Sequence, residues 1–328
     1  MDQRIKELLD IKEANEDTLL NKSNVIGVDV GFKYVEGKRT DEIAIRTFVK
    51  KKENVNPEDE VPRTIDGVKT DVIEEKEVVL QVLEVPVDTP VLEVETGRFN
   101  RLIGGIGIGR CRDINGHINV GTLGAIVQKE NKQFALSNFS VMCIDDSWKK
   151  GDKIVQPSRV DGGDCLKDLL GKLDSVCLSN KFNCQNKQVD AAISTIENKS
   201  LSPEILNIGK VKGTAIPALG IAVRKQGRTT ELTYGTVTGL DRTVSINYGP
   251  SIGIVTLTNQ ITIEPDTTRN TRFSDAGDAG SVIVDEQNRI IGLLCGGTRD
   301  GKANFANRFS DVEEALGISL FTEVPVQT

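Results

Sequence analysis

Few residues of this chain combine a nucleophilic or metal-binding side chain with a spacing that supports chemistry. There is one histidine, His117, and there are six cysteines: Cys111, Cys143, Cys165, Cys177, Cys184 and Cys295. A zinc site needs several Cys or His ligands at short spacings, and the sequence has no Cys-x-x-Cys pair. We therefore expect no metal and no cofactor. In a reducing cytosol the thiols would stay free, whereas export would leave room for a Cys177–Cys184 disulfide.

Composition and charge argue against several classes of function. The 328 residues are 38% hydrophobic and 27% charged, with a net charge of −7. An acidic chain without a concentrated basic surface does not favour nucleic acid as a partner. The charged N-terminal segment lacks the apolar run of a secretory signal, and no stretch reaches the roughly 18 apolar residues of a membrane span. We expect a cytoplasmic protein without a membrane partner.

A set of short motifs occurs in a fixed order along the second part of the chain: Gly121–Ala125 (GTLGA), Leu136–Val141 (LSNFSV), Val189–Ile193 (VDAAI), Gly227–Thr230 (GRTT) and Gly277–Gly280 (GDAG). Together they resemble the trypsin-like (chymotrypsin-fold) serine protease family, in its bacterial branch related to the plant narrow-leaf proteins. The N-terminal stretch VIGVDVGFKYVEGKRTDEIAIRTFV is similar to the leading domain of that branch. The spacing agrees, because 50 residues from position 140 to 190 and 89 from 190 to 279 suit two barrels of short strands.

The resemblance implies a degenerate catalytic triad. It places Ser140 where the family has its histidine base, Asp190 where it has the orienting carboxylate, and Ala279 where it has the nucleophilic serine. A serine hydroxyl is no base near neutral pH, and a methyl group cannot attack a carbonyl. The proton transfer and the covalent step of acyl transfer are therefore both lost.

Other side chains are poor substitutes for the missing groups. His117 lies in a polar turn, 23 residues before Ser140, where a histidine is usually solvated. Ser281 follows Ala279 by two residues and belongs to the next strand. Cys143 and Cys295 have no imidazole to activate them.

The resemblance also implies an oxyanion hole, which is built from backbone N–H groups and needs no catalytic side chain. We expect Gly277 and Ala279 to supply its donors and Asp278 to stabilise the turn. The alternative is that the turn is kept only because the barrel requires it. Phe273, six residues before position 279, would form the floor of the specificity pocket and favour small or apolar side chains.

Hydrophobic patterning supplies the elements that must position these residues. Residues 2–21 predict a helix capped by Asp2, followed by strands from Val25 and Asp41, a short helix at Pro57 and a strand from Thr70. We therefore predict a mainly β fold: a small α+β domain over 1–85, an irregular linker over 86–116 around the string IGGIGIG, and a chymotrypsin-like double six-stranded β-barrel over 117–328. A C-terminal helix follows, with Ser310 and Glu313 as a capping box and Gly317 as its end.

These observations favour a pseudoprotease that acts by binding or scaffolding a peptide, a protein or further copies of itself. One alternative is a serine endopeptidase whose nucleophile was replaced in the laboratory; Ser140 opposes it, because one substitution would suffice. Another is a structural protein that self-associates through its N-terminal helix and α+β domain.

Overall fold

The structure is a computed structural model that describes residues 2–90, 97–182, 184–197 and 199–322. Helix α1 (Gln3–Leu20) begins as predicted at Asp2, whose side chain accepts the N–H of Arg4. It packs on a hairpin of β1 (Val25–Val35) and β2 (Lys38–Val49). Parallel to β2 lies β4 (Val68–Glu74), with β3 (Thr64–Ile65) at the edge. The helix predicted at Pro57 is wrong: residues 57–59 form only a turn, which Pro62 prevents from extending.

The single strand predicted from Thr70 is divided into three strands with three different partners. After β4, the chain forms β5 (Val78–Leu80), which pairs with β21 (Ile290–Thr298). It then forms β6 (Leu83–Pro86), which pairs with β9 (His117–Thr122). We name residues 78–82 the strap. The chain therefore leaves the N-terminal sheet after Glu74, earlier than the boundary predicted at residue 85.

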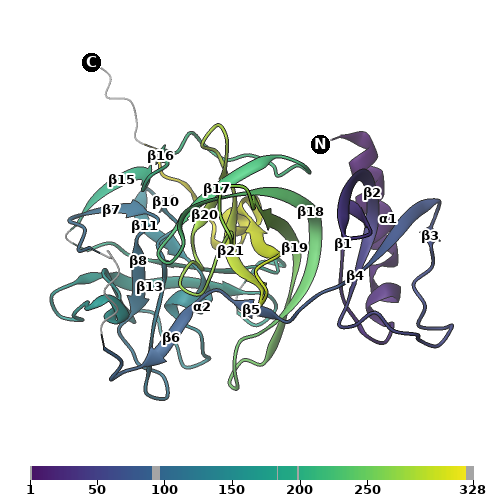
Figure 1. The fold of residues 1–328 in the computed structure, drawn as a ribbon. Coiled ribbons are helices and arrows are strands. Elements are labelled where there is room, and N and C mark those ends of the chain that lie inside the picture. The colour runs from purple at the N-terminus through teal and green to yellow at the C-terminus, as the bar shows by residue number, and fades with distance from the viewer. Residues whose placement is uncertain (1, 91–96, 183, 198, 323–328) are drawn as a thin grey trace.

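The second barrel is a closed ring of six strands: β17 (Ala222–Gly227), β18 (Glu231–Asn247), β19 (Ile254–Pro265), β20 (Val282–Asp285), β21 (Ile290–Thr298) and β22 (Asn304–Arg308). The order runs β17-β20-β21-β22-β19-β18, and the pairing of β17 with β18 closes it. Strand β18 also pairs with β1 through Val30 opposite Leu240. The N-terminal unit thus lies beside the barrels as an extension of the second barrel's sheet (Figure 1).

The first barrel is built on a nine-stranded sheet in the order β23-β10-β11-β14-β13-β12-β8-β9-β6. Its strands are β8 (Gly107–Arg110), β9 (His117–Thr122), β10 (Ala125–Lys129), β11 (Lys132–Ser137), β12 (Lys153–Val155), β13 (Leu169–Leu178) and β14 (Asp190–Ser194), with β6 and β23 (Ser319–Leu320) at its edges. A separate small sheet contains β7 (Arg101–Gly104), β15 (Ser200–Ile205) and β16 (Gly209–Lys210). Short α2 (Phe139–Met142) and the 3₁₀ turn η1 (Arg159–Asp161) complete this half. The predicted fold class, mainly β with a chymotrypsin-like double barrel behind a small α+β unit, is confirmed. Six strands form the second barrel as predicted, whereas the sheet of the first barrel has nine.

The predicted linker over 86–116 is wrong where β7 and β8 form. All four residues of β8 are buried, and β8 pairs with both β9 and β12. The glycines are required by close packing, because a Cβ on Gly104 would lie 2.4 Å from the carbonyl oxygen of Gly124, and one on Gly109 2.4 Å from that of Asn119. Residues 91–96 of the predicted linker lie outside the described residues.

The predicted C-terminal helix is α3 (Phe309–Leu316), which ends at Gly317 with φ 62° as expected. The predicted capping box is wrong. Ser310 lies inside the helix, Arg308 occupies the N-cap, and no side chain caps it. Among the described residues, no helix is long and apolar enough to cross a membrane.

The expectation of free thiols is wrong for most of the cysteines. Cys111 is bonded to Cys165, and Cys177 to Cys184, the pair left open above. Cys143 and Cys295 are free and buried. The first disulfide joins two loop residues 54 positions apart, a proximity that spacing alone does not reveal.

Candidate functional site

Ser140 and Asp190 are in direct contact in the interior of the protein. Helix α2 follows β11 and carries Ser140, while Asp190 begins β14, the strand paired with β11. The Ser140 Oγ donates to Asp190 Oδ2 at 2.8 Å, and the Ser140 N–H donates to Oδ1 at 3.2 Å. Both side chains are fully buried. The serine therefore satisfies the carboxylate but offers no proton acceptor of suitable basicity.

A third residue, Tyr248, shares this carboxylate and was not identified from the sequence. Tyr248 lies in the connection between β18 and β19. Its hydroxyl donates to Asp190 Oδ2 at a distance of 2.9 Å. Burial raises the pKa of Asp190 to about 6, and the hydrogen bonds from Ser140 and Tyr248 oppose that rise. Burial also raises the pKa of Tyr248 well above its ordinary value. No local motif distinguishes Tyr248 from an ordinary core tyrosine.

Ala279 is linked to the same region through the end of β9. Its carbonyl oxygen accepts the N–H of Thr122 at 2.7 Å. A Cβ on Gly121 would lie 2.3 Å from Val141, the neighbour of Ser140, and 3.0 Å from the Ala279 carbonyl oxygen. Gly121 thus lets the base position and the nucleophile position approach the same strand. The structure brings the three predicted triad positions to one region, and their roles stay predictions.

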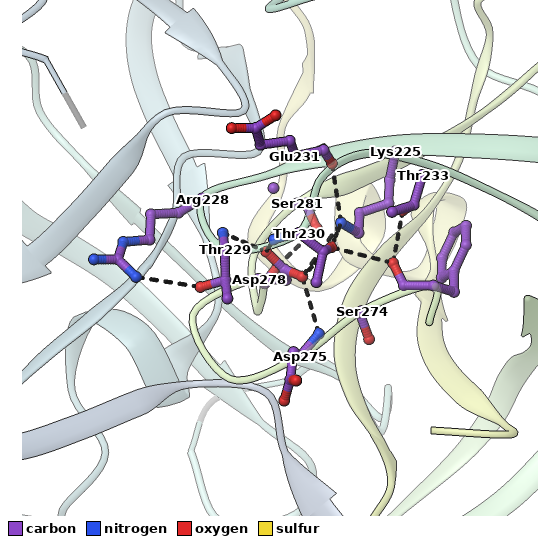
Figure 2. A network of polar contacts seen from close by, with 12 residues as sticks. Lys225, Arg228, Thr229, Thr230, Glu231, Thr233, Ser274, Asp275, Asp278 and Ser281 are labelled. Atoms are coloured by element: carbon purple, nitrogen blue, oxygen red, sulfur yellow. Dashed lines mark hydrogen bonds and ion pairs between the residues drawn. The ribbon is translucent and has the colours of Figure 1, made fainter. Parts of the chain in front are cut away.

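The turn around Ala279 is held by the carboxylate of Asp278. This carboxylate accepts the N–H groups of Thr229 at 2.7 Å, Thr230 at 3.1 Å and Asp275 at 2.9 Å, together with the Thr230 hydroxyl at 2.6 Å. Figure 2 shows these contacts converging on Asp278 from two separate loops. The Gly227–Thr230 motif therefore supplies hydrogen-bond donors that hold the Asp278 side chain in place. A Cβ on Gly227 would lie 2.4 Å from Asp278 Oδ1, so glycine is required there.

Lys225 supplies the counter-charge for this buried carboxylate. Its ammonium lies 3.3 Å from Asp278 Oδ2, and both side chains are fully buried. The same ammonium also donates to the Glu231 carbonyl oxygen at 3.2 Å (Figure 2). Burial lowers the pKa of Lys225, and the neighbouring Asp278 opposes that shift. The ion pair fixes the conformation of the turn that carries Gly277 and Ala279.

The predicted oxyanion donors point at one oxygen atom, and that oxygen belongs to the chain itself. The N–H of Gly277 donates to the Gln81 carbonyl oxygen at 2.6 Å, and the N–H of Ala279 donates to the same oxygen at 2.9 Å. Gly277 has φ 105° and Gly280 has φ 92°, angles that glycine adopts without strain. The paired donors are therefore formed, and a backbone carbonyl from the strap occupies them.

The strap approaches this turn as an extended strand along β21. Leu80 pairs with Gly296, Val79 with Gly297 and Val78 with Thr298 in antiparallel register. The N–H of Gln81 then donates to the carbonyl oxygen of Cys295 at 3.2 Å. Gln81 is thus held by its N–H on one side and its carbonyl oxygen on the other. Its side chain is only 4% exposed.

The rival residues make structural contacts. The Ser281 Oγ donates to the Asp278 carbonyl oxygen at 2.6 Å, and His117 Nδ1 lies 3.0 Å from the Asn115 carbonyl oxygen on the surface. Burial raises the pKa values of Cys143 and Cys295, which disfavours their thiolates. The Phe273 ring is fully buried in the core of the second barrel. Its assignment to the pocket floor stays a prediction.

Comparison with solved structures finds bacterial serine proteases. Protease A from Thermobifida fusca has 19% identity and a TM-score of 0.47, over 67% of this chain and 98% of that chain. A chymotrypsin from Cellulomonas bogoriensis has 18% identity with the same TM-score and coverage. A Nocardiopsis protease has 17% identity, again with TM-score 0.47 over 67% of this chain and 98% of its own. No family model matches the chain, and no curated protein matches it. We draw no inference on activity from these similarities.

Proposed function

We propose that this protein is a pseudoprotease: a protease-like fold that holds an extended peptide segment without cutting it. The observation that carries the proposal is the Gln81 carbonyl oxygen, which accepts hydrogen bonds from Gly277 and Ala279. Two N–H groups converging on a carbonyl are the arrangement that polarises a peptide bond for attack. Here the residue that would attack carries only a methyl group, so the arrangement retains the segment.

The surroundings of Asp190 support natural degeneration over a laboratory substitution of one serine. In a working triad the carboxylate orients an imidazole. In this chain Ser140 and Tyr248 both donate to Asp190 Oδ2. A laboratory substitution at position 279 alone does not explain why the partners of Asp190 are two hydroxyl groups and no imidazole. These partners support a site that has lost its base as well as its nucleophile.

Three narrower points belong to the same proposal. The bacterial branch related to the plant narrow-leaf proteins rests on the motifs alone. The partner is a peptide or protein segment. Light scattering over a concentration series tests whether the chain associates with further copies of itself. The expected cytoplasmic location stays a prediction, and the two disulfides weigh against it, because such bonds persist in oxidising compartments.

Two measurements on the unmodified protein test the absence of catalysis. Intact mass spectrometry should show an uncut chain with the Gln81–Val82 bond present after prolonged incubation. A fluorophosphonate probe should leave the protein unlabelled under conditions that label trypsin fully. Strong labelling would reveal another nucleophile and refute the proposal.

A further inference from the structure

The side chains of the strap are buried in a regular pattern. Val78, Leu80 and Val82 are partly buried and pack against the hydrophobic core cluster that contains Ala279 and Cys295. Gln81 lies between two of these residues and is almost fully buried. An extended segment alternates its side chains in this way. We name the surface that the strap covers, along Gly296–Thr298 of β21, the groove. It contacts the apolar side chains of the strap on one side and Gln81 on the other.

The Gln81 side chain fills space that exists because residue 297 has no side chain. A Cβ on Gly297 would lie 2.7 Å from Gln81 Nε2, so this glycine leaves the space that the amide fills. The same point lies 3.1 Å from the Ala303 carbonyl oxygen and 3.2 Å from Asn304 Oδ1. Asn304 is fixed by the Ser274 hydroxyl, which donates to its Oδ1 at 2.6 Å. These two oxygens already accept hydrogen bonds from Thr298 and Ser274, so the site fits the length and shape of a buried, uncharged glutamine side chain beside Gly297.

We propose that the groove beside β21 binds extended protein segments in which aliphatic residues precede a glutamine, and that the strap is its internal ligand. The occupant that this chemistry selects in trans is a segment of a partner protein with the pattern aliphatic, aliphatic, leucine, glutamine, aliphatic. The inference rests on the proposed function in treating the groove as a binding site.

The strap is anchored at both ends, which determines how a partner competes with it. Upstream, Glu75 pairs with the buried Arg242 at 2.6 Å. Downstream, β6 pairs with β9 over Leu83–Pro86. A tethered ligand acts at an effective concentration on the order of millimolar, so a free peptide displaces it poorly. Binding in trans should therefore strengthen when the strap's own side chains fit the groove less well.

The experiment weakens the strap and leaves β21 intact. The full chain carrying Leu80→Ser and Gln81→Ala is compared with the unmodified protein by fluorescence anisotropy. The probe is a labelled peptide with the sequence of residues 76–84, KEVVLQVLE. We expect the variant to bind it at least tenfold more tightly. A matched control, Gln3→Ala with Ile216→Ser, changes two exposed residues far from the groove and should bind like the unmodified protein.

Peptide variants test selectivity. Replacing the peptide's glutamine by lysine, or its leucine by aspartate, should weaken binding at least tenfold. A scrambled peptide that binds equally well would overturn the inference, as would a cooperatively folded strap variant that gains no affinity. If the strap variant does not fold, hydrogen exchange on the unmodified protein replaces it. Excess peptide should then speed hydrogen exchange at the Gln81 backbone amide. An unchanged exchange rate at saturating peptide would contradict the proposal that a peptide can replace the strap.

The two proposals fail in different ways. Fluorophosphonate labelling together with selective peptide binding would remove the proposed absence of catalysis and leave the ligand class standing. No labelling together with unselective binding would do the reverse.

Discussion

Tyr248 and Ser140 donate to the same atom, Oδ2 of Asp190, at 2.9 Å and 2.8 Å. This oxygen therefore already accepts two hydroxyl groups. In a working triad the corresponding carboxylate would accept a hydrogen bond from the imidazole. A histidine restored at position 140 has to compete with a buried tyrosine hydroxyl for that oxygen. This contact determines how the catalytic machinery responds to reconstruction.

Reconstruction should make the protein cut its own strap. Combining Ala279→Ser, Ser140→His and Tyr248→Ala supplies a nucleophile, a base and the space beside Asp190, while the Gln81 carbonyl already lies between the oxyanion donors. We expect cleavage after Gln81, detected by intact mass. Loss of the serine or the histidine alone costs about 10⁶-fold, so each variant that lacks one of them should stay uncut. Cleavage elsewhere, or none in a folded triple variant, would show that Gln81 is not held as a substrate would be.

Asp190 should make stability fall as the pH rises from about 4 to about 6. Its pKa in the folded protein is about 6, against an ordinary value of 3.8. Within this window the folded state keeps a proton that the unfolded state has released, so raising the pH favours unfolding. The loss amounts to about 3 kcal/mol above pH 6 and is absent below pH 4. Asp190→Asn should lack this component when urea unfolding is measured over the pH range. Parallel curves for the two proteins would contradict the assignment.

The Lys225–Asp278 pair should be expensive to break from one side. Lys225→Met leaves a fully buried carboxylate without its counter-charge, a change that costs about 3–5 kcal/mol of unfolding free energy. The double variant with Asp278→Asn should lose less than the sum of the single changes. Lys302→Met removes an exposed partner of Asp300 and should stay within about 0.5 kcal/mol. Additive single effects in urea unfolding would count against coupling.

The two disulfides should differ in their contribution to stability. Cys111–Cys165 spans 54 residues and Cys177–Cys184 spans 7. Loop-closure entropy then gives about 4 kcal/mol for the first and about 2 kcal/mol for the second. Serine pairs at each site, compared by urea unfolding in oxidising buffer, should reproduce that order. The reverse order would mean that strain or residual structure outweighs chain entropy.

Several features set by neighbouring residues were predicted correctly from local motifs, although the capping box of Ser310 and Glu313 was not. The Asp2 cap, the Gly317 end and the glycine turn at 277–280 were visible because each depends on backbone angles or caps set within a few residues. Ser140 and Asp190 met because adjacent paired strands, β11 and β14, carry them to one end.

The position of the strap beside the Gly277–Gly280 turn could not be predicted in the same way. The strap lies in TDVIEEKEVVLQVLEV, whose apolar residues suit any open edge. Its partner Gly296 is more than 200 residues away from Leu80, and nothing local selects that edge. Tyr248 is similar: it lies 58 residues from Asp190, in a connection without a recognisable motif. The glycines of IGGIGIG were misinterpreted as part of an irregular linker, because close approach between strands and an irregular linker use the same residue type.

The pairing of β1 with β18 also sets a condition on biosynthesis. Val30 and Gly31 emerge from the ribosome long before their partners Leu240 and Gly239. Until then the β1 edge exposes unpaired N–H and C=O groups, which are a template for aggregation. The nascent N-terminal unit therefore lacks one of its strand partners for most of translation.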